Sequence, residues 1–194
     1  MNKTIKFEDW KPEVYRVPIE KYAEVTENAM ITNKYGIYIL DADSLYVHHG
    51  NSPLDYELCE ELGIKVNELK YAGGNIIGSG KDLTVHIIFP KTMGMTHEII
   101  IEKIAKIIGK YVPNTTYDGN DILVDGEKVS GSAIRQICGS WVWMAQISFG
   151  EYSEYIKKLC QKPAIKKPAY INNTLLTRDV LKDELVTWLQ GDAL

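Results

Sequence analysis

The stretch "NDILVDGEKVSGSA", residues 120–133, holds the residue types best suited to chemistry. Asp125-Gly126 is a strong hairpin signal, so the segments before and after it are predicted to pair as antiparallel strands. Lys128 then stands on a strand just after a tight turn, and Ser-Gly-Ser follows with hydroxyls and backbone amides that can contact an anion. Taken alone, a hairpin lysine is most often solvent-exposed, so its role depends on what surrounds it.

A second stretch, "AGGNIIGSG" at residues 72–80, places four glycines between two predicted strands. Without Cβ atoms, such a loop lets backbone amides approach a phosphate or a carboxylate. The two standard nucleotide-binding patterns are absent: GxGxxG does not occur there, and Gly80-Lys81 is followed by Asp82 instead of Ser or Thr. The alternative interpretation is a glycine-rich hairpin that binds nothing.

Helices and strands alternate irregularly around these two stretches. Apolar periodicity and capping residues predict helices at 20–32, 54–62, 96–112, 151–160 and 177–191. Strands are predicted at 36–40, 44–48, 65–69, 82–89, 121–125, 127–131 and 140–149. Short connections favour antiparallel pairing, so we expect an α+β fold with a mixed, mostly antiparallel sheet flanked by helices. Residues 161–173, with two prolines, are predicted to be a linker.

Together the two stretches resemble the lipoate–protein ligase family, part of the biotin/lipoate ligase and octanoyltransferase superfamily. Its members carry an arginine-rich strand that leads into a Gly-Gly-Gly loop, and later Asn-Asp, a short strand and Lys-[Ile/Val]-Ser-Gly-Ser-Ala. The matching residues are Gly73, Gly74, Asp82 and Leu83 in the first block and Asn120, Asp121, Lys128, Val129, Ser130, Gly131, Ser132 and Ala133 in the second.

The resemblance covers roughly residues 36–160 and implies a biotin/lipoate ligase-like, class II synthetase-like catalytic domain. Residues 1–35 are then expected to form an N-terminal segment with a helix. Residues 161–194 are expected to form a linker and a C-terminal helix that packs on the same domain.

The resemblance also implies a two-step reaction. Lipoate, octanoate or a related medium-chain acid reacts with ATP to give an acyl-adenylate, which then acylates a lysine of a lipoyl-domain or H-protein-type acceptor. Lys128 is the expected catalytic cation, because a fixed positive charge is needed where the carboxylate and the α-phosphate meet. Asp121 is expected to help hold Mg²⁺, although an aspartate there could instead cap a turn.

The same resemblance assigns the residues that bind the nucleotide and the acyl-adenylate. They are Gly73, Gly74, Asn75, Asn120, Asp121, Ser130, Gly131, Ser132 and Ala133. The strands "TVHIIF" and "WVWMAQISF" are expected to line an apolar tunnel for an alkyl chain.

The chain departs from the family pattern in three places. The paired arginines before the glycine loop are missing from "ELKYAGG", the third glycine is Asn75, and the usual His-Gly of the later strand is Ala145-Gln146. Possible substitute cations are Lys70, Lys81 and Arg135. The departures keep open a second hypothesis, a divergent non-catalytic member that binds a nucleotide, an acyl group or a protein partner.

Cys160 supports a third hypothesis. The octanoyltransferase branch uses a lysine and a later cysteine that carries the acyl group as a thioester, and Cys160 follows a comparable predicted helix. Transfer through Lys128 and Cys160 would need no ATP, but it would need a thiolate of lowered pKa. A buried structural cysteine is the alternative.

Composition excludes several other classes. The chain has 45% hydrophobic and 25% charged residues and a net charge of -4, which gives no reason to expect a nucleic-acid partner. We expect neither a signal peptide at "MNKTIKFEDW" nor a membrane span, because no apolar run is long enough. Three cysteines without a CxxC pair favour a reducing cytoplasm over a zinc ribbon or a disulfide scaffold.

Overall fold

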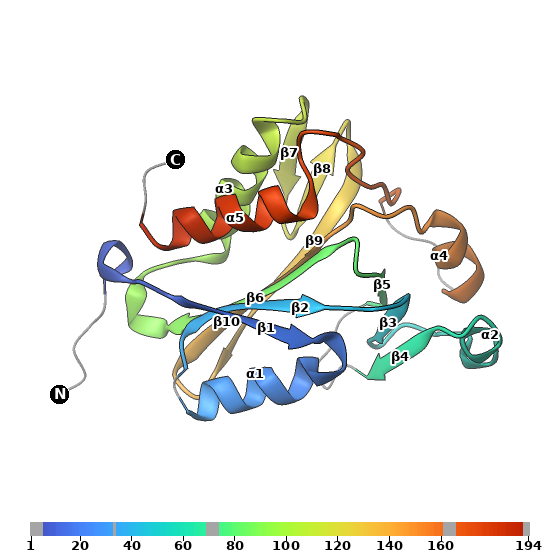
Figure 1. The fold of residues 1–194 in the computed structure, drawn as a ribbon, viewed down its shortest axis with the longest axis horizontal. Coiled ribbons are helices and arrows are strands. Elements are labelled where there is room, and N and C mark those ends of the chain that lie inside the picture. The colour runs from blue at the N-terminus through green and yellow to red at the C-terminus, as the bar shows by residue number, and fades with distance from the viewer. Residues whose placement is uncertain (1–5, 33, 69–73, 161–165, 192–194) are drawn as a thin grey trace.

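The structure, a computed structural model, describes residues 6–32, 34–68, 74–160 and 166–191. Two sheets contain the strands of these residues (Figure 1). The larger has seven strands in the order β1 (Glu13–Pro18), β2 (Gly36–Asp41), β6 (Leu83–Pro90), β10 (Ser140–Ile147), β9 (Glu127–Ile137), β8 (Asp121–Val124) and β7 (Thr115–Asp118). The smaller has the order β4 (Lys65–Glu68), β3 (Tyr46–His49) and β5 (Ile76–Gly78).

Most strand pairs are antiparallel, and β1–β2 and β3–β4 are the parallel ones among those described. The helices are α1 (Tyr22–Ile31), α2 (Tyr56–Glu61), α3 (His97–Gly109), α4 (Ser153–Leu159) and α5 (Arg178–Leu189). This arrangement confirms the α+β fold with a mixed, mostly antiparallel sheet. In Figure 1, α3 and α5 lie on one side of the larger sheet and α1 on the other.

Alternation along β6 and β10 divides their side chains between two environments. Val85, Ile87 and Trp143 face α3 and α5 and are buried in the main core. The intervening side chains, such as His86 and Gln146, face the opposite side, towards β3 and β5. One face of the two strands therefore builds the main core, and the other face packs Ile88 and Val142 into a second hydrophobic cluster and places Gln146 on the side of β5.

Two tight turns shape the strand that carries Lys128. Asp125 (φ 51°) and Gly126 (φ 79°) are both left-handed, as a two-residue hairpin between β8 and β9 requires. β9 does not stop at residue 131 as predicted but continues to Ile137. There Cys138 (φ 49°) and Gly139 (φ 83°) turn the chain into β10. Cys-Gly is a weak turn signal, which explains the error.

The segment predicted to be a linker lies against the start of β9. Lys128 N donates to Lys167 O (2.9 Å), Ala169 N donates to Lys128 O (2.8 Å), and Ile171 N donates to Ser148 O (2.8 Å). Beyond it, α5 buries Leu181, Leu185 and Leu189 in the same core as α3. This part of the chain therefore borders the strand of Lys128.

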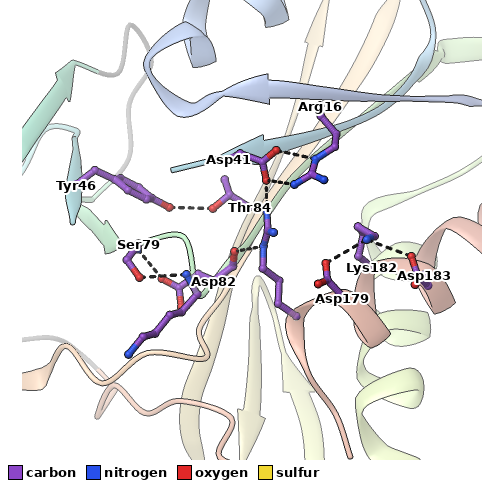
Figure 2. Close-up of polar contacts among 11 residues, drawn as sticks. Arg16, Asp41, Tyr46, Ser79, Asp82, Thr84, Asp179, Lys182 and Asp183 are labelled. Atoms are coloured by element: carbon purple, nitrogen blue, oxygen red, sulfur yellow. Dashed lines mark hydrogen bonds and ion pairs between the residues drawn. The ribbon is translucent and has the colours of Figure 1, made fainter. Parts of the chain in front are cut away.

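Buried polar groups connect the glycine-rich stretch to the rest of the molecule. The Asp82 carboxylate is 1% exposed and accepts from Ser79 N (2.8 Å), Phe149 N (2.8 Å) and Gly150 N (3.1 Å). Figure 2 shows Asp82 beside Ser79, and it also shows Asp41, whose carboxylate accepts from Nε and Nη2 of Arg16. Asp82 thereby fastens the end of the glycine-rich stretch to the end of β10.

Arg178, the first residue of α5, reaches the same region. Its Nε donates to the backbone oxygen of Asp82 (2.8 Å), and its Nη2 donates to Asp41 Oδ1 (2.5 Å).

None of the helices in the described part of the chain combines the length and apolarity that crossing a bilayer requires.

Candidate active site

A cavity of about 490 Å³ lies between the two sheets. β3 and β5 contribute to one wall, and β6, β9 and β10 to the other, and Tyr22 of α1, Tyr152 and Pro168 also line it. The structure gathers in its lining most of the residues that sequence assigned to the site. They are Gly74, Asn75, Asn120, Asp121, Lys128, Ser130, Gly131, Ser132, Ala133 and Arg135.

The β8–β9 hairpin brings Lys128 to Asp121. Asp121 stands opposite Gly131 in the register, and the Lys128 ammonium reaches back to lie 2.8 Å from Asp121 Oδ1. A Cβ on Gly131 would be only 3.1 Å from Lys128 Nζ and 3.2 Å from its Cε. The glycine therefore leaves the space that the end of the lysine side chain occupies.

A second lysine, Lys166, completes this cluster. Its ammonium lies 2.9 Å from Asp121 Oδ2 and 2.9 Å from Asp118 Oδ2. Burial acts to raise the pKa of Asp121, but the hydrogen bonds from Lys128 and Lys166 outweigh it and hold the pKa below its usual value. Asp121 is thus a carboxylate with one ammonium on each oxygen. Sequence reasoning missed Lys166, because no motif in the linker indicates its pairing with β8.

Asp121 was expected to help hold Mg²⁺, and the groups around it bear on that role. In the described part of the chain, no three His, Cys, Asp or Glu side chains are placed to share a metal ion. Protein sites for Mg²⁺ supply one or two free carboxylates, whereas both Asp121 oxygens contact lysines. These residues do not fit a protein-held Mg²⁺, so we derive no step through one.

The two serines of the Ser-Gly-Ser segment have different environments. Ser132 donates to Asn120 O from its amide (2.8 Å) and from its hydroxyl (2.8 Å), which fixes the turn before β8 to β9. Ser130 belongs to the cavity lining, and its hydroxyl is buried and has no hydrogen-bond partner among the described residues.

Asn75, in the position of the family's third glycine, joins the glycine-rich stretch to the loop after β3. Its Oδ1 accepts from Gly50 N (3.1 Å), and its Nδ2 donates to Pro53 O (3.2 Å). Gly74 lines the cavity beside it. Gly73 and Lys70 were also predicted to belong to the site, and both lie outside the described residues.

The remaining predicted residues differ in their relation to the cavity. Arg135 lines it and is half-buried. Lys81 is exposed and does not line it. Cys160 does not line it either; burial raises the pKa of its thiol, although a contact from Asn75 Nδ2 (3.8 Å) acts the other way. A thiol of raised pKa is a poorer nucleophile at neutral pH.

The expected apolar tunnel wall is only partly correct. The strands β6 and β10 do line the cavity, but mainly through Thr84, His86, Met144 and Gln146. Their isoleucines, valines and Trp143 belong to buried hydrophobic clusters instead. The structure thus gives this wall more hydrogen-bonding groups than the apolar character of the strands suggested.

No protein-family model and no curated protein sequence matches this chain. Solved structures do match. The chain superposes on LipL1 from P. falciparum, solved in complex with lipoate, with a TM-score of 0.74 and 14% identity, over 91% of this chain and 62% of that one. The chain thus spans less than two thirds of LipL1.

Two further matches cover more of the other protein. A bi-partite lipoate protein ligase from Thermoplasma acidophilum, studied with its E2 lipoyl domain, gives a TM-score of 0.64 at 13% identity over 92% and 84% of the two chains. Lipoate-protein ligase A bound with ATP gives 0.62 at 14% identity over 95% and 100%. At these identities the matches establish the fold, which is that of the lipoate- and biotin-protein ligase catalytic domains.

Proposed function

We propose that the chain is a divergent lipoate–protein ligase that activates a carboxylic acid with ATP and acylates a lysine on a lipoyl-type carrier domain. The observation that carries this proposal is the placement of Lys128. Lys128 follows the β8–β9 turn and lines the cavity together with Ser130, Gly131 and Ser132, and its ammonium is held by Asp121 at 2.8 Å. Matching structures that hold lipoate and ATP support the same assignment.

In the first step a carboxylate oxygen attacks the α-phosphorus of ATP, the bond to the bridging oxygen breaks, and pyrophosphate leaves. Two anions must approach each other, and Lys128 provides the cation that stabilises the charge between them. In the second step the neutral amine of the carrier lysine attacks the acyl carbonyl and AMP leaves. The proton of the amine passes to solvent or to a nearby base.

Asp121 and Lys166 have a positioning role in this proposal. Asp121 fixes the Lys128 ammonium at 2.8 Å in the absence of substrate. When Lys128 turns to the anionic substrates, Lys166 still neutralises Asp121, so no unpaired carboxylate is left at the cavity wall. Lys166 thus lets Lys128 exchange partners at low cost.

Intact-mass measurement tests the whole reaction. The protein is incubated with ATP, lipoate or octanoate, and a lipoyl domain, and we expect the mass of one acyl group to be added to the lipoyl domain only when ATP is present. Addition from an octanoylated carrier protein without ATP, together with an adduct on Cys160, would favour thioester transfer. Absence of any addition would favour a non-catalytic binding protein.

The role of Lys166 gives a separate prediction. Lys166→Ala should lower the rate of adenylate formation about tenfold, the effect of roughly 1.4 kcal/mol in the barrier. Without Lys166 the pKa of Asp121 rises towards its usual value, so the acid limb of the pH–rate profile should also move to higher pH. Pyrophosphate release measured across pH checks both effects.

Lys167 supplies the matched control, because it is the next residue and forms an ion pair with Glu127 away from Asp121. Lys167→Ala should leave the rate and the profile unchanged, and Lys166→Arg should restore most of the activity. A Lys166→Ala profile that superposes on the wild-type profile would remove Lys166 from the mechanism.

A further inference from the structure

Two carboxylates line the cavity in the described part of the chain, and they differ in what holds them. Both oxygens of Asp121 contact ammonium groups, those of Lys128 and Lys166. Glu151 is exposed and forms no ion pair with any residue that the structure describes. Hydrogen bonds from Ser153 hold the pKa of Glu151 below its usual value, so its side chain is a carboxylate at neutral pH. Glu151 is therefore the cavity carboxylate that can still receive a cation.

The chain is fixed on both sides of Glu151. Gly150 N donates to the buried carboxylate of Asp82 (3.1 Å), and Tyr152 Oη forms a hydrogen bond with Ser79 Oγ (2.7 Å). A Cβ on Gly150 would meet Tyr152 Oη at 2.1 Å, so only glycine lets the tyrosine fold back in this way. These contacts place the backbone of Glu151 before any substrate arrives.

Glu151 and Lys128 border the same part of the cavity. Ser148 N donates to Val129 O (2.8 Å), so Ser148 lies beside the residue that follows Lys128. Glu151 is three residues further on, which is at most about 10 Å of extended chain. Both side chains line the cavity, so a group held at Lys128 lies within reach of a second group that approaches past Glu151.

The proposed reaction brings one cation to this cavity. The acceptor lysine of the carrier domain is almost entirely an ammonium at pH 7, and it must enter from solvent to reach the acyl-adenylate. We propose that Glu151 is a catalytic residue of the second step: it receives the acceptor lysine and stabilises the positive charge that forms on its nitrogen during attack. The inference rests on the proposed function, because it requires an acyl-adenylate near Lys128.

The step balances as follows. The ammonium loses one proton to water, and the neutral amine attacks the acyl carbon. As the N–C bond forms, the nitrogen becomes positive and strongly acidic, and Glu151 takes its second proton. The C–O bond to the phosphate breaks, and AMP leaves with the electron pair. Glu151 then returns its proton to water, and the products are the amide and AMP.

A transfer assay that is separate from activation tests the proposal. The protein is loaded with ATP and octanoate, mixed with a saturating lipoyl domain, quenched at short times and analysed by intact mass. Glu151→Gln should transfer the acyl group about a hundredfold more slowly, the usual effect of losing a group that takes a proton in the transition state. Exchange of labelled pyrophosphate into ATP should stay at the wild-type rate, because Glu151 takes no part in the first step.

The substitution separates charge from structure. Glutamine keeps an oxygen that can accept from Ser153 N, so the start of α4 and the thermal melting midpoint should be unchanged. Glu151→Asp keeps the charge and should recover part of the transfer rate. Glu154→Gln is the matched control, because Glu154 lies on α4 outside the cavity lining, is 70% exposed and pairs with Lys157 (2.9 Å). It should transfer at the wild-type rate.

The outcomes distinguish this inference from the proposed function. Wild-type transfer by Glu151→Gln would overturn the inference alone, and so would a defect that disappears at saturating lipoyl domain or that Glu154→Gln shares. Failure of the wild-type protein to exchange pyrophosphate would overturn the proposed function and the inference with it. Normal exchange with slow transfer in Glu151→Gln alone would support both.

Discussion

Lys128→Ala should reduce acyl-adenylate formation by at least about a hundredfold, because removal of one preorganised group that stabilises transition-state charge typically has an effect of that size. The protein should remain folded. The Lys128 side chain is 39% exposed, and Asp121 keeps its second partner, Lys166, so the substitution leaves no unpaired buried charge. Pyrophosphate release and a thermal melt of the same sample measure the two properties.

Lys167→Ala serves as the control for charge removal at this surface and should react at the wild-type rate. An unchanged rate in Lys128→Ala would exclude Lys128 from the reaction, whatever else the cavity binds. A loss of activity accompanied by unfolding would instead assign Lys128 a structural role.

Asp82→Ala should lower the free energy of unfolding by about 3 kcal/mol. Three backbone N–H groups, those of Ser79, Phe149 and Gly150, lose their common acceptor in a place that water does not reach. Each unmatched buried donor costs about 1–3 kcal/mol, and relaxation of the loop recovers part of the sum. Urea unfolding followed by circular dichroism measures the change.

Asp183 on α5 offers a matched comparison, because its side chain is 71% exposed and contacts only Lys182 among the ion pairs of the described residues (Figure 2). Asp183→Ala should change the free energy of unfolding by less than about 0.5 kcal/mol. Equal unfolding midpoints for Asp82→Ala and Asp183→Ala would show that Asp82 does not hold the glycine-rich stretch in place.

The local parts of the fold were predictable because their signals are local. Thr96 and Thr177 cap α3 and α5 through their side chains, and Asp55 caps α2, and residues of these types mark a helix start within a few positions of sequence. Strand pairing was harder. β2 and β3 are neighbours in sequence but lie in different sheets, and β1, whose partner β2 runs parallel to it, was not predicted. Such pairings depend on contacts that no short sequence window contains.

The residues of the candidate site also divide into those that a local motif predicts and those that depend on distant contacts. The motif around Lys128 pointed to residues that the structure places around one cavity. Lys166 was not found, because its contact with Asp121 joins distant parts of the chain. Local alternation, by contrast, is readable from the sequence: His48 and His49 are adjacent on β3 and face opposite ways, His48 towards the cavity and His49 towards Glu68.

The central claim is that this chain joins a carboxylic acid to the α-phosphate of ATP, and exchange of labelled pyrophosphate into ATP tests it most directly. The exchange needs only the reversible first step, so neither the carrier domain nor its identity affects the result. We predict exchange that requires a medium-chain acid and that is lost in Lys128→Ala. Absence of exchange with every such acid, at concentrations that calorimetry shows to saturate the cavity, would contradict the account.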